Sequence, residues 1–191
     1  IPLIPRFLKE EEELTGASWG SAYHKLLELL DFRQEYDAET LSDAIGQLRA
    51  EKKLSKEMAD CIRISDIMEF LQCGSGRRMQ RAALENKLFK EQPFVLGVDA
   101  EEIYSDTRSD ETILVQGIID VYFEEEGELV VLDYKTDRVR NAEELCEKYR
   151  AQLEYYAQAL EQLLQKKVKE KMIYSFTLKE EISLNRSDKR E

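Results

Sequence analysis

Two aspartates and a lysine stand where two apolar stretches of the sequence end. Asp120 lies in GIIDVYF, and ELVVLDYKT carries Asp133 and Lys135. Side chains alternate along a strand, so Asp133 and Lys135 share one face. Two aspartates on neighbouring strands repel each other unless a cation neutralises them, and Mg²⁺ prefers such oxygen ligands. A lysine beside them stabilises charge on a phosphate or positions water, so the pattern favours metal-dependent hydrolysis of a phosphodiester.

Taken alone, these residues leave other interpretations open. Tripeptides of the form D-x-K are common, and this one is also compatible with a strand-end salt bridge between Asp133 and Lys135, with Asp120 in a turn. Paired carboxylates also serve glycoside hydrolysis. That chemistry leaves Lys135 and His24 unexplained, and a sugar site usually has more aromatic platforms than the single tryptophan of this chain.

The segments that position these residues are expected to be strands of one sheet. Residues 112–126 and 128–136 are rich in β-branched and aromatic side chains, and the short turn around Gly127 predicts that they pair as an antiparallel hairpin. Residues 89–98 and 171–178 are also strand-like. The polar stretch after the first of these strands is compatible with a hairpin loop.

Amphipathic spacing predicts helices on either side of the strands. Ser21 is expected to cap the first helix, and the pair Gly74–Gly76 is expected to interrupt the helical region. This order of elements predicts an α/β fold with a central mixed sheet flanked by helices. The expected helices cover residues 20–32, 38–54, 56–71, 77–88 and 141–165.

The composition is that of a globular domain with a large negative charge. The chain has 191 residues, and 28 basic against 40 acidic side chains leave a net charge of −12, which argues against a protein coated by nucleic acid. A local basic groove remains compatible with that total. Three cysteines without C-x-x-C spacing favour a reducing compartment such as the cytoplasm. No apolar run approaches the ~18 residues of a membrane span, so no membrane association is expected.

Four motifs follow one another in an order that resembles one nuclease family. GIID and LDYKT are preceded by GSAYH (20–24), a small residue followed four positions later by His24, and are followed by QLEYY (152–156), a Q-x-x-x-Y pattern. KEQPF resembles an acid–x–Pro–Phe strand with Glu91 as the acid. From about residue 20 to the final strand, the chain is therefore similar to the RecB-family nucleases of the PD-(D/E)XK superfamily. Within that family it resembles the helicase-fused nuclease domains of the AddA type.

The resemblance implies a role for each matching residue. Asp120 and Asp133 would be metal ligands, and Lys135 would be the catalytic lysine. The backbone carbonyl of Tyr134 would complete the metal shell. His24 would ligate the metal or lie against it, although a lone histidine on an amphipathic helix is more often a surface or core residue.

Three further residues are less sharply defined by the motifs. Gln152 and Tyr156 lie four positions apart and so share a helix face, where they would line the site and hold DNA or the lysine. Taken alone, they would be an ordinary interface pair. Glu91 would approach the metal, or is simply a strand-edge acid.

The resemblance also implies a restriction-endonuclease-like core with an N-terminal or inserted helical region. Residues 1–18, which lack an initiator Met and a leader pattern, would be a linker from a preceding helicase region. Residues 19–191 would form a single nuclease domain, with a helical region at 31–87 and the catalytic core at 88–191. The implied cofactor is Mg²⁺, for which Mn²⁺ substitutes. No iron–sulfur cluster is expected, because the family's cysteine quartet is absent.

The implied activity is deoxyribonuclease action on a DNA strand delivered by a fused helicase, with exonuclease favoured over endonuclease action. The remaining AddA-type helicase chain and its AddB-type counterpart would be the partners in bacterial double-strand break repair. The alternative is a nuclease fold whose site has decayed and which only docks partners or DNA. The intact set of motif residues argues against such decay.

Overall fold

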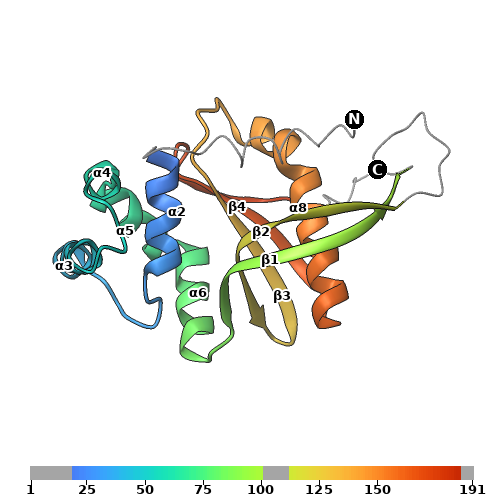
Figure 1. Ribbon diagram of the computed structural model, residues 1–191, viewed down its shortest axis with the longest axis horizontal. Coiled ribbons are helices and arrows are strands. Elements are labelled where there is room, and N and C mark those ends of the chain that lie inside the picture. Colours follow the sequence, from blue (N-terminus) through green and yellow to red (C-terminus); the bar gives the residue numbers. More distant parts are fainter. Residues whose placement is uncertain (1–18, 101–111, 186–191) are drawn as a thin grey trace.

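The computed structural model describes residues 19–100 and 112–185 of the chain (Figure 1). These residues form a five-stranded sheet with helices on both of its faces, so the predicted α/β class with a flanked mixed sheet is confirmed. The predicted linker at 1–18 lies outside the described residues, as does residue range 101–111 of the predicted hairpin loop. Both therefore stay predictions, as does the division of the chain into 31–87 and 88–191.

The sheet is antiparallel except at one central pair of strands. Its order follows the chain, and only the third and fourth strands run parallel. A parallel step requires a crossover, which a long helix supplies here. The strands are β1 (Leu88–Asp99), β2 (Thr112–Glu125), β3 (Glu128–Lys135), β4 (Val168–Ser175) and β5 (Glu180–Ser183).

The predicted β2–β3 hairpin is confirmed, and its turn contains Gly127 with a φ of 83°. That left-handed conformation favours glycine, because it has no Cβ. Strand β5 was not expected from the sequence. It is four residues long and mostly exposed, with only Ile182 buried, so it lacks the alternation that marks a strand.

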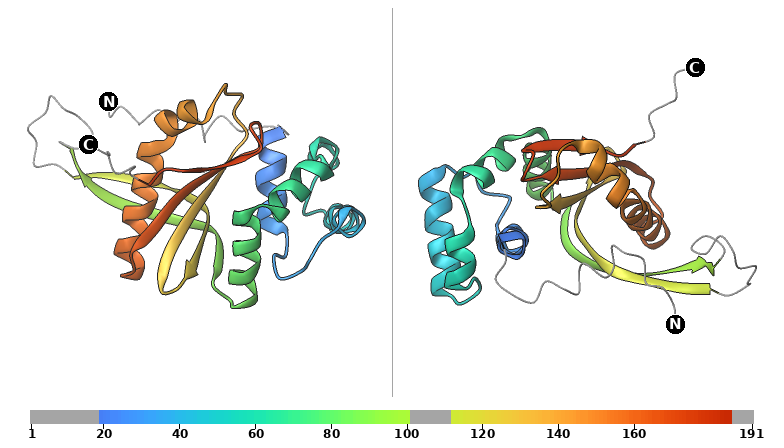
Figure 2. Two further views of the ribbon diagram at one scale, coloured as in Figure 1. Left: turned by 180° about the vertical axis from the view of Figure 1, so that it is seen from behind. Right: turned by 90° about the horizontal axis from the view of Figure 1, so that it is seen from above.

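Helices cover the two faces of the sheet unequally. Figure 2 shows the five N-terminal helices on one side and the long helix α8 on the other. Within the described part, no helix is long and apolar enough to cross a membrane. The helices are α2 (Trp19–Leu29), α3 (Ala38–Ala50), α4 (Lys56–Cys61), α5 (Ile64–Gln72), α6 (Gly74–Leu84) and α8 (Ala142–Leu164).

The prediction of one helix over 56–71 was wrong, because a tertiary contact divides it. The backbone leaves the helical region at Ile62, where ψ is 125°. The N–H of Arg63 then donates to the hydroxyl of Tyr23 at 3.2 Å instead of continuing the helix. Helix α2 thereby contacts the junction between α4 and α5.

Two predictions about helix ends also need correction. Ser21 does not cap α2, because that helix already begins at Trp19. Gly74 and Gly76 do not interrupt the helical region but form the first turn of α6. A Cβ atom at Gly76 would lie 2.2 Å from the carbonyl oxygen of Phe70, so the two helices approach too closely there for any side chain.

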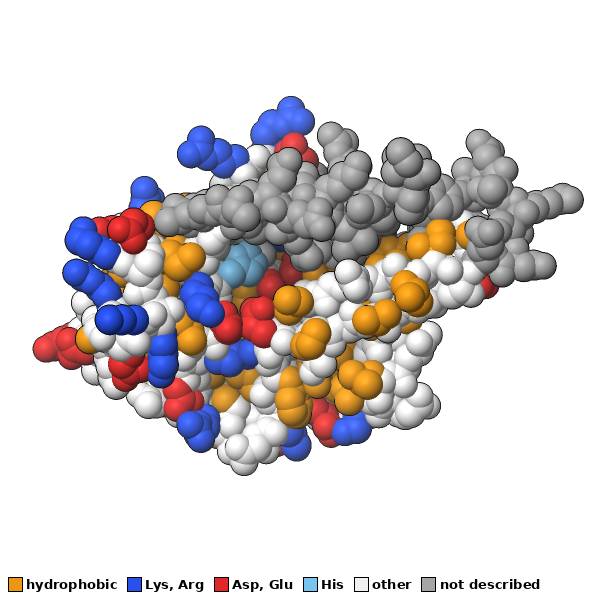
Figure 3. Space-filling view, in the orientation of Figure 1, with side chains coloured by type: hydrophobic (Ala, Val, Ile, Leu, Met, Phe, Trp, Pro, Cys, Tyr) orange, Lys and Arg blue, Asp and Glu red, His pale blue; other side chains and the backbone are white. Residues whose placement is uncertain are grey.

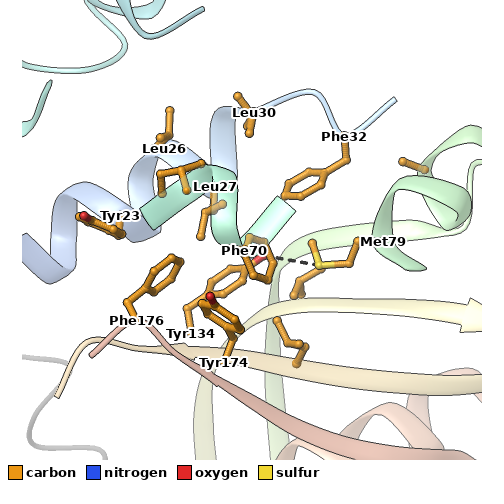
Figure 4. Close-up of a cluster of buried hydrophobic side chains, with 14 of the residues drawn as sticks. Tyr23, Leu26, Leu27, Leu30, Phe32, Phe70, Met79, Tyr134, Tyr174 and Phe176 are labelled. Atoms are coloured by element: carbon orange, nitrogen blue, oxygen red, sulfur yellow. Dashed lines mark hydrogen bonds between the residues drawn. The ribbon is translucent and has the colours of Figure 1, made fainter. Parts of the chain in front are cut away.

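Strand β3 separates two hydrophobic cores, as the predicted alternation of its side chains requires. Val130, Leu132 and Tyr134 pack with the N-terminal helices. Leu129 and Val131 pack with α8 on the opposite face. Figure 4 shows the first core, where aromatic rings from α2, α5 and the sheet meet edge to face, and where the hydroxyl of Tyr134 contacts the sulfur of Met79.

Candidate active site

The two predicted aspartates lie opposite each other on the central hairpin. Strand β2 pairs Val121 with Leu132, and the same register one step further places Asp120 opposite Asp133. The backbone N–H of Tyr134 donates to Asp120 Oδ2 at 3.0 Å. Side chains opposite each other on antiparallel strands point to the same face, so the hairpin brings both carboxylates together as predicted.

A break in the β1–β2 ladder shapes the same place. The ladder pairs Lys90 with Val121 and Gln92 with Ile119, but skips Glu91 and Asp120 between them. Glu91 has a φ of 52°, a left-handed conformation that is uncommon for a residue with a side chain.

The break changes which core the two strands face. Leu88 packs with the N-terminal helices, whereas Phe94, an even number of residues later on β1, packs with α8. On β2, Val121 and Ile119 differ in the same way. The two acids therefore lie at a bend where the strands pass from one core to the other.

His24 reaches this bend from helix α2. Its Nε2 lies 3.1 Å from Asp120 Oδ2, and its Nδ1 lies 3.0 Å from the carbonyl oxygen of Gly20. Burial lowers the pKa of His24, but the charge of Asp120 and the hydrogen bonds outweigh it and raise the pKa to about 9. Burial alone would raise the pKa of Asp120, and the charge of His24 holds it below its usual range. A protonated imidazole donates to both oxygens, so the two groups form a charged pair.

Three groups hold the ammonium of Lys135. Its Nζ lies 2.6 Å from Asp133 Oδ2 and donates to Gln152 Oε1 at 2.9 Å. It also lies 3.8 Å from the centroid of the Tyr149 ring. The lysine side chain is only 13% exposed, so these contacts offset a charge that would otherwise be costly to bury.

Asp133 is almost fully buried, and its charge is only partly compensated. Burial raises its pKa to about 7, the charge of Lys135 opposes that rise, and the carboxylate of Asp120 adds to it. Its Oδ2 accepts no well-aligned hydrogen bond from any described residue, although Lys135 Nζ is 2.6 Å away. A buried carboxylate oxygen of this kind, next to a second carboxylate, fits the position of a bound cation.

The donor set suits a divalent cation, but the side chains are engaged with one another. Asp120 pairs with His24, and Asp133 pairs with Lys135. Within residues 19–100 and 112–185, no three side chains of His, Cys, Asp or Glu are arranged to hold a metal ion together. Such an ion would take carboxylate oxygens from Asp120 and Asp133. It would complete its shell with carbonyl, water or phosphate oxygens, as Mg²⁺ commonly does.

All these groups border one open cavity of about 480 Å³. Figure 3 shows the chain's one histidine at the surface of a hollow, beside acidic side chains. Glu91 lines the cavity too, and burial, with the nearby charges of Asp120 and Glu28, raises its pKa to about 7. The structure thus brings together five predicted residues, His24, Glu91, Asp120, Asp133 and Lys135, with Gln152 beside them.

Tyr156 lies apart from this group. Its ring is buried in the core between the sheet and α8, where it packs edge to face on Phe94 at 5.4 Å. It is not among the residues that line the cavity. Its proposed hold on DNA or the lysine therefore stays a prediction, and so does metal ligation by the carbonyl of Tyr134.

Tyr149 is a site residue that the sequence analysis did not identify. It lines the cavity from α8, three positions before Gln152 and therefore on the same helix face. That spacing from Gln152 was the signal that could have found it. Tyr149 also fits the apolar stripe of the helix, so its type and position alone indicate a core residue.

A mixed sheet whose central hairpin ends in paired aspartates and a D-x-K lysine, with a helix glutamine on that lysine, defines a class of metal-dependent nuclease folds. Comparison with known families agrees. A profile of the PD-(D/E)XK nuclease superfamily matches residues 4–189, and the chain belongs to this superfamily. Nucleases of this superfamily generally use divalent metal ions.

Individual relatives are named as the A-type component of an ATP-dependent helicase/nuclease. The chain is 38% identical to the protein of Lachnoclostridium phytofermentans over 96% of its own length, and 34% identical to that of Clostridium novyi over 94%. A relative from Clostridium botulinum is 35% identical over 95% of the chain. The chain spans only 14–16% of the length of these relatives.

Proposed function

We propose that this chain is a Mg²⁺-dependent deoxyribonuclease domain that hydrolyses phosphodiester bonds in a DNA strand. One observation carries the proposal: α2, β2, β3 and α8 bring His24, Asp120, Asp133, Lys135 and Gln152 to one open cavity. A simple strand-end salt bridge does not account for this arrangement, because it leaves His24 and Gln152 without a reason to converge there. The superfamily membership supports the same activity.

Each side chain has a distinct task in this proposal. A divalent cation at Asp120 and Asp133 would supply Lewis-acid stabilisation of the phosphate and of an attacking water. Lys135, held by Gln152, offers its ammonium to the charge that develops on the phosphoryl oxygens. His24 holds the carboxylate of Asp120 in place through a charged hydrogen bond. Glu91, at the edge of the cavity, is placed to accept a hydrogen bond from metal-bound water.

The substrate proposed for the site is a DNA strand delivered by a helicase. A chain with a net charge of −12 binds a polyanion weakly by itself, because phosphate contacts supply much of the nonspecific affinity for DNA. A fused motor removes that limit by raising the local concentration of the strand. The relatives are named as helicase/nuclease components, which supports this arrangement.

The wider setting follows from the AddA-type resemblance and is part of the proposal. The partners would be the remaining helicase chain and its AddB-type counterpart, acting in double-strand break processing in the bacterial cytoplasm. We expect exonuclease rather than endonuclease action, because such a motor delivers a strand from its end.

Cleavage of end-labelled single-stranded DNA by the 191-residue chain tests the activity. We expect cutting with Mg²⁺ or Mn²⁺, no cutting with EDTA, and loss of cutting in Lys135→Ala and in Asp120→Ala. Lys167→Ala is the matched control, because that lysine is 73% exposed and paired only loosely, at 3.5 Å, with Glu128. A circular single strand in place of the linear one separates the two modes, since an exonuclease spares it.

If the chain does not cut, calorimetry with the same metals decides between the two remaining interpretations. Mg²⁺ or Mn²⁺ binding that is lost in Asp120→Ala would indicate a competent site that needs its motor to supply DNA. Absence of any binding near the carboxylates would overturn the nuclease proposal. A docking module with a decayed site would then be the better account.

A further inference from the structure

Tyr149 makes two contacts of different kinds in the candidate active site. The face of its ring lies 3.8 Å from Lys135 Nζ, measured to the ring centroid. Its hydroxyl donates to Asp137 Oδ2 at 2.8 Å. Only 5% of the residue is exposed, so the ring is held from both its edge and its face.

Asp137 is in turn fixed by its surroundings. It lies in the connection between β3 and α8, two residues after Lys135, and also accepts a hydrogen bond from Lys148 at 2.8 Å. Burial raises the pKa of Asp137, but hydrogen bonds from Lys148 and Tyr149 lower it below the usual range. An ionised Asp137 therefore ties the first turns of α8 to the end of β3, directly beside the lysine.

The ring contributes something that the other two contacts of Lys135 do not. Lysine has a long, flexible side chain, and Asp133 and Gln152 hold its ammonium from two directions only. An aromatic face attracts a cation without taking one of its N–H groups in a directional bond. The ammonium is thus restrained while a donor remains for a substrate oxygen.

We propose that Tyr149 is a positioning residue for Lys135, and that Asp137 holds the Tyr149 ring in the orientation that this requires. The inference rests on the proposed function, in which Lys135 is the catalytic lysine. It assigns a task to the segment from Asp137 to Tyr149 beyond the connection of a strand to a helix.

A purely structural role for Tyr149 makes different predictions. The residue packs in the core with Leu145 and Leu153, so a side chain of similar volume would satisfy that role equally well. Tyr149→Phe keeps the ring and loses the hydroxyl, whereas Tyr149→Leu keeps apolar volume and loses the ring. Tyr155→Leu is the matched control, because Tyr155 is on the same helix but does not line the cavity.

The kinetic test compares metal-dependent cleavage of single-stranded DNA by these variants. We expect Tyr149→Leu to lower kcat about tenfold with little change in KM, because a desolvated cation–π contact is lost at the catalytic group. Tyr149→Phe should retain kcat within about threefold, because the cation–π contact is made by the ring face. Equal activity in Tyr149→Leu and Tyr155→Leu, with similar melting temperatures, would overturn the proposal.

A spectroscopic test works even if the isolated chain does not cleave DNA. A proton above an aromatic face is shifted upfield, so the ε-methylene signal of Lys135, identified by its loss in Lys135→Ala, should be upfield of the other lysines. The shift should persist in Tyr149→Phe and disappear in Tyr149→Leu. An unshifted Lys135 signal in the unsubstituted chain would refute the positioning role. A shifted signal without metal-dependent cleavage or metal binding would instead refute the proposed function while leaving the contact intact.

Discussion

His24 and Asp120 are 96 positions apart in the chain, yet Nε2 of the imidazole lies 3.1 Å from Oδ2 of the carboxylate. The same oxygen accepts the backbone N–H of Tyr134 at 3.0 Å. Asp120 therefore joins the first helix to the two central strands. The contact explains why a histidine motif near the start of the chain belongs to a site built on a distant hairpin.

Loss of this contact should impair both stability and activity. In His24→Ala, Asp120 keeps the Tyr134 amide as its hydrogen-bond donor among the described residues, and a poorly compensated buried charge costs about 2 kcal/mol. We expect a lower denaturation midpoint and a fall in Lys135-dependent cleavage of about a hundredfold, the usual scale for an electrostatic contact in an active site. Urea denaturation and cleavage assays measure the two effects.

The companion variant His24→Gln retains a side-chain donor towards Asp120. It should recover most of the stability that His24→Ala loses. Equal destabilisation by the two substitutions would show that the hydrogen bond to Asp120 is not what holds helix α2 to the hairpin.

Glu91→Gly should stabilise the fold while lowering activity. Glu91 holds a φ of 52°, and release of a non-glycine residue from the left-handed region gains about 1 kcal/mol. The substitution also removes a half-buried carboxylate from beside Asp120. Chemical denaturation at pH 7.5 without metal ions measures the gain, and metal-dependent cleavage measures the loss.

Glu91→Ala separates the two causes, because it removes the carboxylate but leaves a Cβ at the strained position. It should be less stable than Glu91→Gly. If Glu91→Ala and Glu91→Gly are equally stable, the left-handed backbone carries no measurable strain.

Gly76→Ala should destabilise the chain by about 2–3 kcal/mol, because overpacking against backbone atoms is poorly relieved. The added Cβ would lie 2.2 Å from the carbonyl oxygen of Phe70 and 2.8 Å from Cα of Leu71. Gly46→Ala is the matched control in α3, where nothing lies within 4 Å of the new Cβ. It should be neutral or stabilising by about 1 kcal/mol, the helix propensity difference. Similar denaturation midpoints for the two variants would contradict the close approach of α5 and α6.

The ion pairs around Arg78 should make stability depend on pH in the acid range. Hydrogen bonds from Arg78, followed by those from Lys169, outweigh burial and lower the pKa of Glu125 from 4.5 to about 2. A carboxylate with a depressed folded pKa stabilises the native state above its unfolded pKa, and this stability is lost as the pH falls through the folded value. The contribution, about 1 kcal/mol for a partly exposed pair, should therefore be complete at pH 6 and fade between about pH 4.5 and 2.

Denaturation curves of the chain and of Glu125→Gln over this pH range measure the effect. The two should converge at the acid end and differ at pH 6. Glu126→Gln is the control, since that side chain is 85% exposed and lies 3.4 Å from Lys169. It should follow the unsubstituted chain at every pH, and a matching effect at Glu126 would assign the dependence to net charge instead of the Arg78 pair.

Local sequence patterns determined much of the architecture. The β2–β3 hairpin follows from two β-rich segments and a turn at Gly127, and the 141–165 helix from apolar residues at three- and four-residue steps. Alternation along β3 correctly separated Val130 and Leu132 from Leu129 and Val131. These features depend on neighbours a few positions apart, which a sequence displays directly. The motif spacing likewise sufficed to select His24, Asp120, Asp133, Lys135 and Gln152 as candidates.

Tertiary contacts decided the rest, because they join residues that no local pattern relates. The break between α4 and α5 depends on the Tyr23 hydroxyl, and the first turn of α6 tolerates no side chain at Gly76 because Phe70 lies against it. The bend at Glu91 exists only where two strands pass between two cores. The Tyr149 ring lies against Lys135 only once α8 packs on the sheet, whereas Tyr156 on the same helix turns into the core. Side-chain chemistry could be read along the chain, but which groups share a cavity was decided by packing.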